Sequence, residues 1–147
     1  MMINEQKIER VTQRLMDMLG IEPYIESIEF KYHATRKDTY GYMIQENNGL
    51  HKVVINVTEC GGEKGIIHTM AHELRHVWQS VQGFDLLKDY HIYRQTYNTN
   101  IYELDADRFA DMIVYKKRYK ANEDGLYISN LDIVKHSVNT IIAKAIA

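Results

Sequence analysis

Two histidines stand four residues apart in a stretch of helical hydrophobic periodicity, with a glutamate directly after the first. This part of the chain reads His72-Glu73-Leu74-Arg75-His76. Residues four apart on an α-helix project from the same face about one turn apart, so both imidazoles can bind one metal ion. The glutamate then lies close enough to reach a water molecule on that ion. The spacing favours zinc-dependent hydrolysis, but five residues alone also fit an ordinary solvated helix face.

The helix that must carry this motif is predicted over about residues 63–82. The glycine pair at 61–62 breaks the chain before it, and Gly83 follows at a position suited to a left-handed helix end. His72, His76 and Gln79 form a stripe next to the apolar one, at the edge of the predicted buried face. The apolar residues recur at steps of three, four and seven, and they are Ile66, Ile67, Met70, Ala71, Leu74, Val77, Trp78 and Val81.

A catalytic zinc site needs a third protein ligand and keeps one position for water, whereas a structural site is closed by four protein ligands. Glu103 and Asp107 lie four apart in a second helical stretch, beside an apolar face. Carboxylates so close to a packed face are costly to leave unpaired. We expect Glu103 to bind the metal and Asp107 to accept the second ring N–H of a ligand histidine. Asp105 is an alternative ligand, ranked lower because it projects about 160 degrees or more from the line of the other two.

H-E-x-x-H followed by E-x-x-x-D on a later helix resembles the gluzincin metallopeptidases, the thermolysin-like class. In the residues of the second motif, and in its short separation in sequence from the first, the chain is most similar to the ImmA/IrrE-type peptidases and the minigluzincins. The resemblance implies one zinc ion held by His72, His76 and Glu103. It also implies that Glu73 is the general base and that Asp107 supports a ligand histidine. It identifies no substrate.

The predicted fold is α+β, a small zincin-like single domain spanning residues 1–147. The resemblance covers about residues 53–115 of it. We expect an antiparallel or mixed sheet of about three strands packed on about four helices. Besides the two motif helices, helical spacing predicts an N-terminal helix ending at Gly20 and a final packing helix from about residue 129 or 130 to 146.

Three strands are predicted, at Ile25–Tyr32, Thr39–Gln45 and Lys52–Val57. The Asn-Gly step between the last two is a strong hairpin signal. In the peptidase class a sheet edge binds the substrate as an added strand, which would give this sheet a use. The plainer interpretation of the last strand is a buried one.

Composition limits the function classes. A chain of 147 residues that is 45% hydrophobic fits one domain with one core. A net charge of -2, from 18 basic and 20 acidic residues, gives no general attraction to nucleic acid. The basic run at 116–120 is more typical of a helix end, where cations complement the helix dipole. No stretch approaches the ~18 apolar residues of a membrane span.

Cys60 is the only cysteine, so no disulfide can form within the chain, and a cytoplasmic location is expected. A cysteine can block a zinc site by binding the ion. Directly before two glycines, however, a single cysteine is more often a small space-filling residue.

Hydrogen-bonding aromatic residues are dense between the two motif helices, at Tyr90, His91, Tyr93 and Tyr97. One of them, or His136 in the predicted final helix, could stabilise the oxyanion of a tetrahedral intermediate. A single donor of this kind contributes roughly 2.7 to 4 kcal/mol. Alternatively, these tyrosines cap the core with their hydroxyl groups in solvent.

The sequence therefore predicts a zinc metallopeptidase, an endopeptidase acting on proteins or peptides, with a zinc-activated water and Glu73 as general base. The main alternative is a non-catalytic domain that zinc stabilises and that binds a protein partner. Glu73 argues against it, because a structural site has no need of a base between its ligands. A nucleic-acid-binding module using Lys116–Lys120 is least favoured. The substrate and the oligomeric state stay open.

Overall fold

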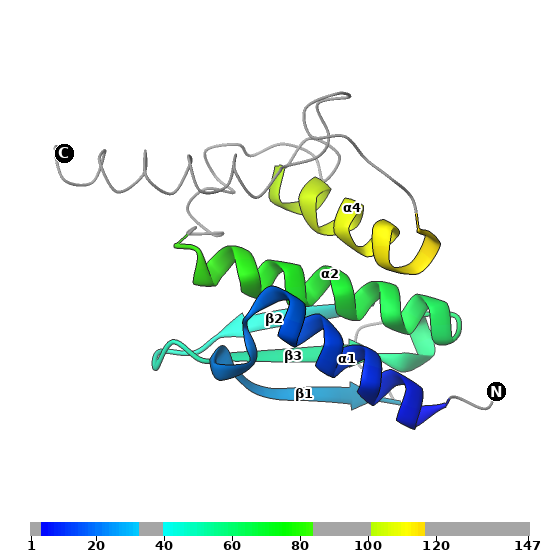
Figure 1. Cartoon of the computed structure of the whole chain (residues 1–147). Coiled ribbons are helices and arrows are strands. Elements are labelled where there is room, and N and C mark those ends of the chain that lie inside the picture. Colours follow the sequence, from blue (N-terminus) through cyan, green and yellow to red (C-terminus); the bar gives the residue numbers. More distant parts are fainter. Residues whose placement is uncertain (1–3, 33–39, 84–100, 117–147) are drawn as a thin grey trace, which may run out of the picture.

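The computed structural model of the chain describes residues 4–32, 40–83 and 101–116. This part has an α+β fold with a three-stranded mixed sheet, as predicted, and three α-helices rather than four. The predicted final helix lies outside the described residues. The helices are α1 (Glu5–Leu19), α2 (Glu63–Val81) and α4 (Ile101–Tyr115), and the strands are β1 (Ile25–Lys31), β2 (Gly41–Gln45) and β3 (His51–Asn56) (Figure 1).

Helix α1 begins after a capping asparagine, Asn4, and ends before a glycine, Gly20. The side chain of Asn4 accepts a hydrogen bond from the backbone N–H of Lys7 at 3.0 Å, which satisfies one free donor of the first turn. Gly20 adopts a left-handed conformation with φ 67°, and its N–H bonds back to the carbonyl of Asp17. The predicted end at Gly20 is confirmed.

The sheet has the order β1-β3-β2. Strands β2 and β3 form the predicted antiparallel hairpin, with Tyr42 opposite Val54, while β1 runs parallel to β3. Strand β3 is therefore central, and all but one of its residues are buried. The last predicted strand could have been a substrate-binding edge or a buried strand. The structure shows that it is buried, and that β1 and β2 form the edges of the sheet.

Helix α2 lies between the sheet and α4, with α1 packed alongside it (Figure 1). Its bounds agree with the predicted 63–82 because glycines with positive φ stand on both sides, Gly61 and Gly62 before it and Gly83 after it. Its apolar stripe enters a core shared with β3 and α1. In the described part of the chain, no helix is long and apolar enough to span a membrane.

Candidate metal centre

The polar stripe of α2 faces α4. His72, His76 and Gln79 all make hydrogen bonds or ion pairs with residues of α4 or with each other. On a 3.6-residue helix this stripe lies across from Met70 and Leu74, which are fully buried in the core. The sequence suggested that the stripe lies at the edge of the core face of α2. In the structure it lies on the opposite side of the helix instead. A second helix covers it.

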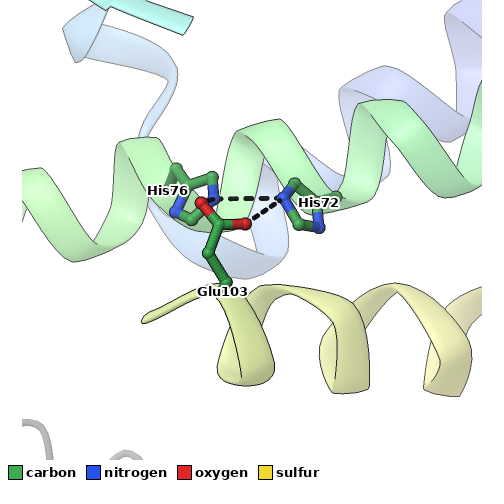
Figure 2. Close-up of side chains that lie close together, drawn as sticks. All are labelled: His72, His76 and Glu103. Carbon is green, nitrogen blue, oxygen red and sulfur yellow. Dashed lines mark hydrogen bonds and ion pairs between the residues drawn. The ribbon is translucent and has the colours of Figure 1, made fainter. Parts of the chain in front are cut away.

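Three ligand groups converge between the two helices, as predicted. The Nε2 atoms of His72 and His76 lie 3.1 Å apart, and the Glu103 carboxylate contacts them at 3.0 and 3.1 Å (Figure 2). All the potential ligand atoms lie within 4.8 Å of one another. Among the described residues no fourth His, Cys, Asp or Glu joins this group. Two imidazole nitrogens and one carboxylate oxygen are a donor set that zinc takes in catalytic sites.

The other ring nitrogen of each histidine has its own partner. The Nδ1–H of His72 donates to Asp107 at 2.7 Å, which is the role predicted for Asp107. The Nδ1–H of His76 donates to the side-chain oxygen of Gln79 at 2.8 Å. In the neutral form of each ring, with the proton on Nδ1, Nε2 carries a lone pair. Lone pairs facing one another at this distance need a proton or a cation between them, so the residues fit a metal ion.

Asp105 lies outside the candidate ligand group. Its carboxylate is completely buried and accepts two hydrogen bonds from Arg75, at 2.8 and 3.2 Å, and one from Gln79 at 2.8 Å. The guanidinium of Arg75 stacks 3.9 Å above the ring of Trp78. The sequence patterns predicted no role for Arg75 or Gln79. One signal could have pointed to Arg75. Helical geometry turns Asp105 away from the other two carboxylates, so this aspartate needs a different partner, and an arginine of the motif helix can supply one.

The charges of the ligand group stabilise one another. Burial opposes charge on His72, but hydrogen bonds to Asp107 and Glu103 outweigh it and raise the pKa of His72 to about 10. Burial also acts to lower the pKa of His76, but its hydrogen bond to Glu103 and the charges of Glu103 and Glu73 together raise it. Burial acts to raise the pKa of Glu103, but the bonds from both histidines hold it well below its usual range. The chain alone therefore keeps a proton where a metal ion would lie.

Glu73 lies on the motif helix but outside the ligand group. It is 8% exposed, and burial raises the pKa of its carboxyl group against the opposing effect of His76 and His72. It directly follows His72 in α2. No described residue donates a hydrogen bond to it. A buried carboxylate next to ligand groups but not engaged by them is suited to accept a proton.

A third histidine extends the contact between the helices by one turn. His68 meets Asp111 at 2.8 Å, just as His72 meets Asp107. Because both helices repeat at four residues and run in opposite directions, three successive turns of α2 each meet an acidic residue of α4. His68 lies outside the candidate ligand group, so its contact with Asp111 joins the two helices without being part of the candidate metal centre.

Cys60 is also outside the ligand group. Its thiol donates to the carbonyl of Asn56 at 3.2 Å and packs against the core, and burial raises its pKa. These contacts agree with the interpretation of Cys60 as a small space-filling residue.

The five predicted oxyanion or substrate contacts, Tyr90, His91, Tyr93, Tyr97 and His136, lie outside the described residues. Of the basic run at 116–120, the structure describes only Lys116, directly after the last residue of α4.

Searches against protein-family models, curated proteins and solved structures found no match. The resemblance to gluzincins is therefore carried by the two sequence motifs and stays a prediction.

Proposed function

We propose that this protein is a zinc-dependent metallopeptidase of the gluzincin type, acting on proteins or peptides. The observation that carries the proposal is the convergence of His72, His76 and Glu103 beside the buried Glu73. The three candidate ligand side chains come from two helices, and both histidines direct Nδ1 at an acceptor, so that Nε2 faces the ligand group. We also expect the cytoplasm as its location, because the one cysteine is a thiol.

Each residue of the centre has a separate task in this proposal. His72, His76 and Glu103 hold the ion. When bound, zinc acts as a Lewis acid and lowers the pKa of a water molecule from about 15.7 to roughly 7. Glu73 accepts the proton of the attacking water and then passes it to the leaving amine. Asp107 keeps the ring of His72 in position through its hydrogen bond to Nδ1.

The decisive experiment separates zinc binding from hydrolysis. Zinc content of the purified protein is measured by metal analysis, and activity is measured by mass spectrometry after digestion of an unbiased peptide library. We expect Glu73→Gln to keep zinc and to lose peptide cleavage, because the amide cannot accept a proton. His72→Ala and Glu103→Ala should lose zinc. Cleavage at the wild-type rate by Glu73→Gln would disprove the mechanism.

A second function has one observation in its favour. The ligands belong to both α2 and α4, so a bound ion would clamp the two helices together. A non-catalytic domain that zinc stabilises and that binds a protein partner would use the centre in this way. It predicts that zinc raises the unfolding midpoint, that no peptide in the library is cut, and that Glu73→Gln changes neither result.

A further inference from the structure

We propose that Gln79 is a positioning residue that keeps the proton of His76 on Nδ1, so that Nε2 presents its lone pair to the metal. The proposal rests on the metal site of the proposed function but does not require that the site hydrolyse peptides. It gives a role to a buried amide that lies beyond the H-E-x-x-H motif and is not itself a ligand.

The two ends of the Gln79 amide have different partners. Its side chain is completely buried. The NH₂ group donates to the backbone carbonyl of Tyr102 at 3.0 Å and to the carboxylate of Asp105 at 2.8 Å. The oxygen lies 2.8 Å from Nδ1 of His76. Every polar atom of this amide is therefore in use.

These contacts fix the orientation of the amide. Turning it over would place its oxygen against the Tyr102 carbonyl and the Asp105 carboxylate, two acceptors that offer no proton. Asp105 cannot move away easily, because the buried guanidinium of Arg75 holds both of its oxygens. The oxygen of Gln79 must then face His76, where it can only accept. This requires the proton of His76 on Nδ1, and an unprotonated Nε2 is the form that binds metal.

The two ligand histidines are thus positioned by different chemistry. His72 has a carboxylate partner, Asp107, and His76 has a neutral amide. An amide adds no further negative charge beside Glu73, Glu103 and Asp107. The charge of Asp105, which orients the amide, is balanced by Arg75. The structure therefore fixes both rings while limiting the negative charge in the centre.

Two substitutions at this position test the role. Gln79→Met keeps the length of the side chain but leaves His76 without a strong acceptor. Gln79→Glu keeps an acceptor for Nδ1–H and loses the donors to Tyr102 and Asp105. Zinc affinity is measured by competition with a chromophoric chelator, and stability by urea unfolding of the zinc-free protein.

We expect Gln79→Met to bind zinc about 10 to 100-fold more weakly, the usual effect of losing such a partner. Gln79→Glu should be less stable than the wild type and still bind zinc more tightly than Gln79→Met. A merely structural role would instead make the zinc affinities of the two variants follow their stabilities, and that result would overturn the proposal. Wild-type zinc affinity in Gln79→Met would overturn it as well.

A measurement on the unaltered protein decides the question even if a variant does not fold. Imidazole ¹⁵N spectra of the zinc-loaded, histidine-labelled protein should show His76 bound through Nε2 with a slowly exchanging proton on Nδ1. Binding through Nδ1 would contradict the proposal while leaving the metal site intact. If the wild-type protein binds no zinc at all, the proposed metal site fails, and this inference fails with it.

Discussion

Helix α2 is covered on two sides, and the two contacts are made of different chemistry. Toward the sheet and α1 it presents an apolar stripe that includes Met70, Leu74 and Val77, all without exposed surface. Toward α4 it presents histidines, an arginine and a glutamine that meet carboxylates. Both sides are packed, but among the described residues only the second side brings together three side chains that could bind one metal ion.

The apolar contact with the sheet and the polar contact with α4 differ in how they stabilise the fold. Apolar burial stabilises by roughly 1.5 to 3 kcal/mol for a side chain, with little dependence on direction. Buried polar contacts give little net stability when complete, but they cost several kcal/mol when one partner is removed, and they fix atoms in particular positions. We therefore expect substitutions on the sheet side to change stability alone. Substitutions of the candidate ligands and their partners on the α4 side should change zinc affinity, with or without a change in stability.

The largest effect should come from Asp105→Ala. This change leaves the guanidinium of Arg75 buried without its carboxylate and releases the amide of Gln79. Removing one partner of a buried ion pair typically costs about 3 to 5 kcal/mol. We expect a loss of this size in the free energy of unfolding, measured with urea and chelator present. Zinc affinity of the folded protein should fall as well.

Leu74→Ala is the matched change on the sheet side of the same helix. A buried leucine truncated to alanine costs about 2 to 5 kcal/mol, so the two variants lose similar stability. The folded Leu74→Ala protein should bind zinc as the wild type does, because its polar face is unchanged. If both variants lose zinc affinity in proportion to stability, the two sides of α2 are not separable and the comparison is wrong.

A smaller effect, seen mainly in zinc binding, is expected from Asp107→Asn. Asp107 is partly exposed, so its loss should cost less stability than the loss of buried Asp105, but its charged carboxylate makes the ring of His72 a stronger ligand than a neutral amide partner would. Zinc affinity should fall about 10 to 100-fold, as for other partners of ligand histidines. Asp111→Asn is the control, since it makes the same change one turn along α4, where His68 is not a ligand. Equal losses in the two variants would show a general charge effect.

The sequence predicted those features that depend on local spacing. The H-E-x-x-H helix has the expected bounds because glycines stand at both its ends, and the hairpin forms at the expected Asn-Gly step. The ligand group was also predictable, since residues four apart on a helix share a face whatever lies opposite. The side chains whose expected proximity the structure confirms, those of His72, His76, Glu103 and Asp107, all have this origin.

The rest depends on how two helices lie against each other. Helical geometry could rank Asp105 below Glu103 as a ligand, but it could not show that Arg75 and Gln79 of α2 would meet Asp105. Their contact depends on the angle and separation of helices that are distant in the sequence. The parallel pairing of β1 with β3 is non-local in the same way, because no hairpin turn specifies it.

Counted for each pH unit, the smallest effect is a change with pH, and it has opposite signs for zinc binding and for stability. In the zinc-free protein the pKa of His72 is raised from 6.5 to about 10. A raised pKa in the folded state means that the stabilisation is complete below about 6.5 and is lost as the pH rises through about 10. The zinc-free protein should therefore become less stable from pH 7 to 10, as measured by urea unfolding with chelator present.

Zinc affinity should change in the opposite direction over the same range, because the ion must displace the proton that His72 holds. With one proton released, affinity rises up to about tenfold for each pH unit, since one pKa unit corresponds to about 1.36 kcal/mol. Asp107→Asn should reduce both slopes, because the hydrogen bond from Nδ1 to Asp107 is the main contact that raises the pKa of His72. Leu74→Ala should keep both slopes, since it alters only the sheet side. Zinc affinity that stays constant between pH 7 and 9 would mean that no proton occupies the site before the metal does.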